Sequence, residues 1–181
     1  MQVLGISGSL RQGSFNTAAL RAAQGLAPAG MMIEIADISA IPLYDQDLRD
    51  AGFPTAAEAL CRQIAAADGV LIATPEYNYS VSGVLKNAID WASRFQPQPF
   101  DGKPIAILGA AAGRLGTARA QYHLRQIFVF LNGLVINKPE VMIGSAAQAF
   151  DDQGNLTDEM SRELIGQLLT ALADWQARLK G

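Results

Sequence analysis

Residues 5–20, GISGSLRQGSFNTAAL, combine small residues, hydroxyl groups and one arginine in a pattern that suits anion binding. An apolar run precedes them and an alanine-rich stretch follows, so we expect the chain to leave a strand here and enter a helix. The first amides of a helix lack partners and carry roughly +0.5 of charge, which attracts anions. Arg11 would add a full positive charge and a planar fork that fits two phosphate oxygens. The segment therefore predicts a phosphate-binding loop.

The remaining residues of this loop fit the same prediction. Neutral donors for a phosphate would come from Ser7, Ser9, Ser14 and Asn16. Gly8 and Gly13 would permit a positive φ and a close approach of the backbone. The alternative is an ordinary strand-to-helix turn in which Ser14 caps the helix and Arg11 points into solvent.

The motifs that the loop lacks exclude some classes of phosphate-containing ligand. It has no G-x-x-x-x-G-K-[ST] pattern and no lysine, which argues against hydrolysis of nucleoside triphosphates. Its glycines do not have the G-x-G-x-x-G spacing, and no acidic residue is placed to bind a ribose diol. A ligand that ends in a phosphate and is otherwise bound by other parts of the chain fits better, and FMN is such a ligand.

A second loop, TPEYNYS at 74–80, follows a buried apolar run at 69–75. A planar aromatic ligand needs apolar walls, a stacking surface and a few polar donors. Tyr77 could supply a ring and Asn78 an amide, with Pro75 and Glu76 beside them. The alternative is a turn that begins at the proline and packs its tyrosines locally.

A third loop, GAAAGRLGTARAQ at 109–121, is rich in small residues. Such residues would let backbone amides approach the edge of a ligand, and Arg114 would lie near negative charge that develops there. Its glycines are spaced four and three apart, so it is not a dinucleotide fingerprint. The alternative is a flexible strand-to-helix loop.

Apolar runs of strand length alternate with helical patterns along the whole chain, which predicts one α/β domain over 1–181. We expect strands at 2–7, 31–38, 69–75 and 104–110, one or two short strands within 133–143, helices at 15–27, 55–68, 83–95, 117–131 and 157–179, and a long loop at 39–54. Thr55 and Glu58 have the spacing of a capping box. Nearly continuous apolar strands favour a five-stranded parallel sheet between two helical layers, a flavodoxin-like three-layer sandwich with strand order 2-1-3-4-5. Ligands of such sheets bind beyond the carboxyl ends of the strands, where all three loops would lie.

Composition excludes several classes of protein. The 181 residues are 50% hydrophobic and 17% charged, with a net charge of −3, so a nucleic-acid partner is not expected. No apolar stretch is long enough to insert into a membrane, and one cysteine cannot form an intrachain disulfide, which fits a cytoplasmic location. Cys61 and His123, each on a predicted helix, are interpreted as structural. No metal site is predicted, because zinc ligands are missing.

Three segments resemble the NADPH-dependent FMN reductase family, and among its members most of all the bacterial chromate and quinone reductases. They are GSLRQGSFN at 8–16, PEYNYSVSGVLKNAIDW at 75–91 and ARAQYHLRQIFVFLNGLVINKPE at 118–140. The resemblance implies a flavodoxin-like fold that binds FMN non-covalently and works as a homodimer or homotetramer. One departure is Ser82, where the family commonly has proline; serine also suits a helix start.

The resemblance also implies roles for particular residues. The FMN phosphate would be surrounded by Ser9, Arg11, Ser14, Phe15 and Asn16; the isoalloxazine would be lined by Pro75, Glu76, Tyr77 and Asn78 and closed on its other side by Gly113 and Arg114. The 41–48 loop would border the flavin site of the partner subunit. Independently of the resemblance, the apolar positions of helices 83–95 and 117–131 spread over more than one face, which suggests contact with another subunit. The candidate polar contacts between subunits are Arg119, Arg125, Tyr79 and Glu140.

The implied activity is a two-step exchange at the flavin. NADPH or NADH would deliver hydride to FMN, and a quinone, or else an azo compound, chromate or free flavin, would then take the electrons. No catalytic side chain is predicted, because the cofactor carries this chemistry. The main alternative is a flavodoxin-type electron carrier, which is usually strongly acidic and lacks an arginine in its phosphate loop. A flavin-free receiver-type domain would need an acidic cluster that the strand ends lack.

Overall fold

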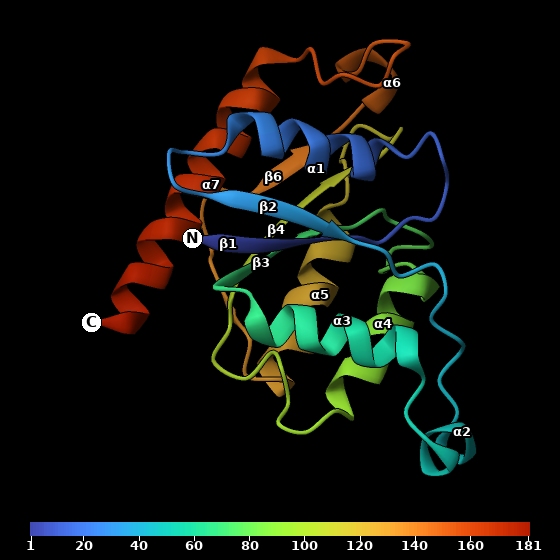
Figure 1. The fold of residues 1–181 in the computed structure, drawn as a ribbon. Coiled ribbons are helices and arrows are strands. Elements are labelled where there is room, and N and C mark those ends of the chain that lie inside the picture. The colour runs from blue at the N-terminus through green and yellow to red at the C-terminus, as the bar shows by residue number, and fades with distance from the viewer.

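The computed structural model describes residues 1–181 and contains a parallel sheet with the order β2-β1-β3-β4-β5 (Figure 1). Its strands are β1 (Gln2–Ser7), β2 (Met32–Ala36), β3 (Gly69–Ala73), β4 (Pro104–Ala110), β5 (Leu134–Val135) and β6 (Val141–Ile143). The predicted fold class and strand order are thus confirmed.

The fifth position of the sheet is shared by two short strands, so the five-stranded sheet of the predicted fold class has six strands; two short strands within 133–143 were one of the two predicted possibilities. β5 pairs with Pro104 and Ile105 at the start of β4, whereas β6 pairs with 108–110 at its end. Between β5 and β6 lies Pro139, which has no amide hydrogen to donate to a strand ladder. β5 and β6 therefore pair one after the other with the same neighbouring strand, β4.

Helices cover both faces of the sheet (Figure 1). One face packs against α1 (Phe15–Leu26) and α7 (Glu159–Lys180), and the other against α3 (Thr55–Ala66), α4 (Gly83–Ser93) and α5 (Ala118–Phe130). Of two short helices, α6 (Ala146–Ala149) adds Ala146 and Ala149 to the core on the first face, whereas α2 (Gln46–Ala51) buries no residue. No helix combines the length and apolar character needed to cross a membrane.

The central strands are buried on both faces because their side chains alternate between the two helical layers. In β3, Leu71 and Ala73 belong to the core with α1 and α7, whereas Val70 and Ile72 belong to the core on the opposite face. Full burial of such an aliphatic side chain contributes about 1.5–3 kcal/mol. This two-sided burial explains why the strand is apolar without interruption.

Two local predictions are wrong. The cap position of α3 is Pro54 rather than Thr55, and no side chain caps that helix end. Glu58 does not reach back to the helix start, because its carboxylate pairs with Arg62 at 2.6 Å. The 39–54 segment is not entirely a loop, since Asp45 accepts a hydrogen bond from the Asp47 amide and starts α2.

The 39–54 segment, here called the arm, is fastened to α4 by side chains of the sequence NAIDW. The carbonyl oxygen of Pro42 accepts hydrogen bonds of 2.8 Å from both Asn87 Nδ2 and Trp91 Nε1. The Tyr44 amide donates to Asn87 Oδ1 at 2.8 Å, and the Tyr44 ring packs edge-on against the Trp91 ring. The arm is therefore held at its base while α2 stands away from the body (Figure 1).

We predict that Gly109→Ala lowers the free energy of unfolding by about 1–3 kcal/mol, the usual range for overpacking. A Cβ at Gly109 would collide with the Thr117 hydroxyl and with the Thr74 carbonyl oxygen, which is backbone and cannot rotate away. Denaturant unfolding would measure the change. Gly166→Ala on α7 is the matched control: nothing lies within 4 Å of its Cβ, so helix propensity should stabilise it by up to about 1 kcal/mol. Wild-type stability of Gly109→Ala would contradict the close packing at this point.

Candidate functional site

A cavity of about 370 Å³ lies at the carboxyl edge of the sheet, where the three loops singled out from the sequence meet. Its lining consists of Ser9, Arg11, Ser14, Phe15, Asn16, Pro75, Glu76, Tyr77, Ala110, Ala111, Ala112 and Gly113. Of the side chains predicted to bind cofactor, only Ser7, Asn78 and Arg114 do not line this cavity; the buried Ser7 hydroxyl lies 2.8 Å from the Thr17 hydroxyl instead. The fold thus brings together side chains that are almost one hundred positions apart in the sequence.

One end of the cavity is the start of α1. Ser14 caps this helix, because its hydroxyl accepts a hydrogen bond from the Thr17 amide at 3.3 Å. The amides of Phe15 and Asn16 donate no hydrogen bond within the chain. Arg11 is exposed, with its guanidinium 5.5 Å from the centre of the Phe15 ring and bonded to the Gly13 carbonyl. Two amides without an acceptor in the chain, called open amides below, therefore lie with one cation at the same end of the cavity.

Asn16 has a structural task that its sequence position did not reveal. Its Nδ2 donates to the Ala110 carbonyl at 3.0 Å, and its Oδ1 accepts from the Ala110 amide at 2.9 Å. The side chain is buried and uses both ends of its amide on this one residue. Asn16 therefore ties the first loop to the end of β4, and this tie uses its side-chain oxygen and one of its two side-chain N–H groups.

Glu76 ties the second loop to the start of α5. One carboxylate oxygen accepts from the amides of Arg119 at 2.9 Å and Ala120 at 3.1 Å, and the other accepts from the Arg119 guanidinium at 2.9 Å. Burial raises the pKa of Glu76, but the hydrogen bonds from Ala120 and Arg119 lower it by more, so the pKa lies below its ordinary value. Glu76 is thus a fixed anion that caps α5, because the side chain at the cap position, Thr117, accepts no hydrogen bond from the first amides of the helix.

The second loop closes in a two-residue turn between Tyr77 and Ser80. These residues exchange two backbone hydrogen bonds of 3.0 Å, and the residues between them have positive φ, 51° at Asn78 and 67° at Tyr79. Positive φ at both central positions is the geometry of a type I′ turn. The Arg119 guanidinium lies 3.9 Å from the centre of the Tyr79 ring and stabilises this turn. Asn78 is consequently at the tip of the turn and outside the cavity lining.

Arg114 lies beside a neighbouring cavity and not beside the one that Gly113 lines. That second cavity is bordered by Gly144, Ser145 and Gln148. The third loop bends after Gly113, whose carbonyl accepts hydrogen bonds of 3.2 Å from the amides of Gly116 and Ser145. The bond from Ser145 is long-range, and no pattern in the local sequence indicates it.

The other reactive side chains lie outside the cavity. Cys61 is fully buried, and burial together with the nearby Glu58 charge raises the pKa of its thiol to about 12. It therefore stays a protonated core thiol at neutral pH. His123 is exposed and its Nδ1 lies 3.1 Å from the Ser80 hydroxyl, at the outer side of the second loop. No group of three or more His, Cys, Asp or Glu side chains is arranged to hold a metal ion.

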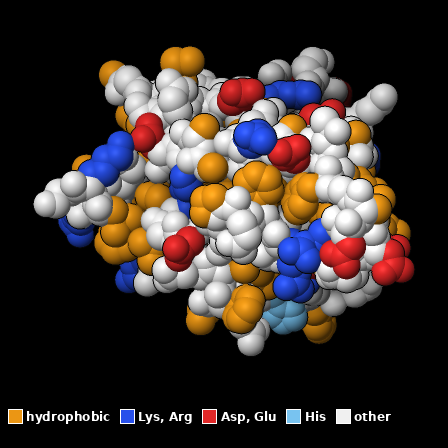
Figure 2. All heavy atoms as spheres, turned by 60° about the horizontal axis from the view of Figure 1, so that its bottom comes forward, with side chains coloured by type: hydrophobic (Ala, Val, Ile, Leu, Met, Phe, Trp, Pro, Cys, Tyr) orange, Lys and Arg blue, Asp and Glu red, His pale blue; other side chains and the backbone are white.

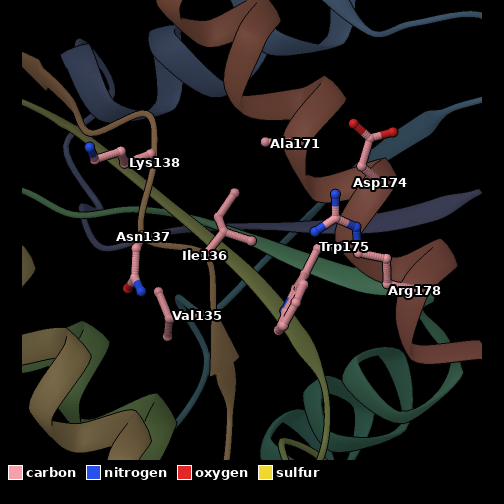
Figure 3. A pocket seen from close by; sticks show the side chains of 8 residues that line it. All are labelled: Val135, Ile136, Asn137, Lys138, Ala171, Asp174, Trp175 and Arg178. Carbon is pink, nitrogen blue, oxygen red and sulfur yellow. The ribbon is translucent and has the colours of Figure 1, made fainter.

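Figure 3 shows a different cavity of about 270 Å³ between the β5–β6 connection and the second half of α7. Trp175 forms part of its wall and donates from Nε1 to the Leu134 carbonyl at 3.1 Å. Lys138 and Arg178 are exposed at its rim. It lies near β5, which pairs with the start of β4, and so is remote from the carboxyl edge. None of the residues that the sequence predicted to bind cofactor lines it.

Comparison with known proteins assigns the chain to a family. The model of the NADPH-dependent FMN reductase family matches residues 1–148. An NAD(P)H-dependent FMN reductase of Pseudomonas aeruginosa is 66% identical over 181 residues, which is 100% of this chain and 98% of that protein. A quinone reductase of Escherichia coli is 49% identical over 183 residues, covering 99% of this chain and 97% of that protein.

A solved structure agrees with this assignment over nearly the full length. The flavoenzyme NAD(P)H:(acceptor) oxidoreductase FerB of Paracoccus denitrificans has a TM-score of 0.88 and 34% sequence identity, covering 98% of this chain and 97% of its own. The fold, the position of the cavity and the sequence relatives therefore agree. The chain belongs to the NADPH-dependent FMN reductase family and is an NAD(P)H-dependent oxidoreductase with a flavodoxin-like fold.

Proposed function

We propose that the chain binds FMN in the carboxyl-edge cavity and uses it to reduce quinones with NADPH or NADH. The observation that carries this proposal is the combination of two open amides at the start of α1 with Arg11 at one end of the cavity. The names of its relatives support the choice of substrate, because they include FMN and quinone reductases. Azo compounds, chromate and free flavin remain further acceptors to be tested.

The α1 end of the cavity fits a phosphate monoester. Such a group carries about −1.5 to −2 charges at neutral pH, and the helix start offers only roughly +0.5. Arg11 supplies the further positive charge, and the hydroxyls of Ser9 and Ser14 lie at the same end. The open amides of Phe15 and Asn16 would donate to phosphate oxygens.

The opposite side of the cavity fits the edge and face of a flavin ring. The amides of Ala112 and Gly113 donate no hydrogen bond within the chain, and nothing lies within 4 Å of the position of a Cβ on Gly113. These amides would donate to the ring carbonyl oxygens, while Pro75 and Tyr77 would provide a wall. Bound FMN would supply the hydride chemistry. Glu76 would act indirectly by fixing the Tyr77 loop.

We also propose that two copies pair, and that the arm of one copy borders the cavity of the other, alone or within a tetramer. The supporting observation is that Leu43 is 82% exposed although the arm is anchored at Pro42. Val129 and Phe130 at the end of α5 are 81% and 89% exposed. Figure 2 shows hydrophobic side chains reaching the surface on this side of the molecule, some of them beside the single histidine.

Arg11→Ala is expected to weaken FMN binding by about 1.5–3 kcal/mol, the range for a hydrogen bond to a charged group. Fluorescence titration of flavin-free protein would measure the dissociation constant. Arg21→Ala, which removes an exposed arginine from the same helix, is the control and should keep wild-type affinity. Unchanged affinity of Arg11→Ala would place that side chain in solvent, and wild-type protein that binds no FMN would refute the proposed cofactor.

Steady-state oxidation of NADPH or NADH by a quinone is expected to give parallel double-reciprocal lines. One cavity open at the carboxyl edge would receive the nicotinamide and the acceptor in turn, so each would leave before the other reacts. A panel of quinones, azo dyes, free flavin and chromate, tested with both nicotinamides, would rank the acceptors. Bound flavin that NADPH and NADH both fail to reduce would instead favour an electron carrier.

Leu43→Asp is expected to shift the protein toward single chains, because it puts a charge on the proposed contact between the arm and the partner. Light scattering coupled to size-exclusion chromatography would give the mass. Leu179→Asp changes an exposed leucine near the end of α7 and should leave the mass unchanged. If Leu43→Asp has the mass of the wild type, the arm does not contribute to assembly.

A further inference from the structure

Ser82 lies at the start of α4 and makes two hydrogen bonds with one hydroxyl group. It donates to the carbonyl oxygen of Gly8 at 2.6 Å, and it accepts from the Leu85 amide at 3.3 Å as the cap of α4. The residue is only 1% exposed and does not line the candidate cavity. The first of these bonds joins two segments that are 74 positions apart in the sequence.

Gly8, the residue that receives this bond, is held tightly by the segment that leads from β3 to α4. Its amide donates to the Ala73 carbonyl at 2.8 Å. A Cβ at this position would lie 2.9 Å from Pro75 Cδ and 3.2 Å from both the Leu85 side chain and the Ser82 hydroxyl oxygen. The amide and the carbonyl group of Gly8 are therefore both fixed to that segment, and its side chains leave little room for a Cβ at Gly8.

The loop that follows Gly8 has few other attachments. Residues 10–13 are exposed, and the hydrogen bonds of this stretch stay within the loop. The Arg11 amide donates to the Ser9 hydroxyl, the Ser14 amide to the Arg11 carbonyl, and the Arg11 guanidinium to the Gly13 carbonyl. The loop is consequently positioned by its two ends, which are Gly8 and the capped start of α1. A change at Gly8 would move Ser9 and Arg11 relative to the Tyr77 loop.

We propose that Ser82 is a positioning residue for the phosphate-binding loop. By fixing the Gly8 carbonyl, its hydroxyl sets the distance between the end of the cavity that holds the phosphate and the end that holds the flavin ring. This inference rests on the proposed function, since it assumes that FMN occupies the cavity. Its consequence is that Ser82 governs the preference for FMN over riboflavin, which has the same ring but no phosphate.

Proline is a suitable replacement because the backbone at Ser82 already accommodates it. The φ of Ser82 is −67° and its ψ is 150°, and its amide donates no hydrogen bond within the chain. Ser82→Pro therefore removes the hydroxyl while it keeps the course of the chain. Ser82→Ala is a second variant, which removes the same hydroxyl without constraining the backbone.

The experiment is a titration of flavin-free protein with FMN and, separately, with riboflavin, followed by fluorescence. We expect both Ser82 variants to bind FMN about fivefold to tenfold more weakly, the effect of about one net hydrogen bond, and riboflavin within about twofold of the wild type. Asp158→Ala is the matched control: it removes the side-chain cap of α7, which accepts from the Ser161 amide at 2.8 Å. It should lower the melting temperature and change neither affinity.

Three results would overturn the inference. FMN affinity equal to the wild type in both Ser82 variants would show that the Gly8 tie does not position the loop. An equal loss of FMN and riboflavin affinity would assign Ser82 a general structural role. Wild-type protein that binds riboflavin as tightly as FMN would mean that no phosphate loop operates, and this result would refute the proposed function as well.

Discussion

The candidate site depends on three side chains, each of which fastens one loop of the carboxyl edge to a neighbouring segment. Ser82 joins the first loop to the β3–α4 segment through Gly8, Asn16 joins the first loop to β4, and Glu76 joins the second loop to the start of α5. All three bonds end on backbone groups that burial separates from water, so breaking one would leave a buried polar group without a partner, at a cost of about 1–3 kcal/mol. These hydrogen bonds connect each of the three loops to the other two, so no loop can shift alone. The cavity is therefore preformed, which reduces the ordering that a ligand would otherwise require.

Three helices start at the same edge of the sheet, and they differ in which groups accept hydrogen bonds from their first backbone amides. The start of α5 faces the ionised Glu76, and the start of α4 is capped by Ser82. At α1, Ser14 caps one amide while two others stay open beside Arg11. A helix start that already faces a carboxylate repels a further anion, whereas one beside a guanidinium attracts it. The distribution of charge thus makes the start of α1 the most favourable of the three for an anion.

The NAIDW sequence illustrates how a recognisable motif can serve the structure around a site. Asn87 and Trp91 direct their polar groups at the carbonyl of Pro42, which lies in the arm and not in the cavity. Aromatic rings of the arm close around the same tryptophan. These contacts keep the arm projecting from the body with Leu43 exposed. An exposed arm of this kind is what the proposed contact with a second copy needs.

The sequence by itself determined the alternation of strands and helices, and with it the fold class, its strand order and the sheet edge where the three loops meet, because the alternation follows from local patterns. Apolar period, helix starts and the position of a loop after a strand are properties of neighbouring residues. The tertiary structure decided how the individual side chains are used. Asn16 bonds to a residue 94 positions away, Glu76 to one 43 positions away, and Arg114 turns toward a different cavity. The division of the fifth strand and the helix within the arm have local causes instead, because Pro139 interrupts the strand and Asp45 caps α2. A polar side chain takes the partner that the packed fold brings within reach, and no local pattern encodes that choice.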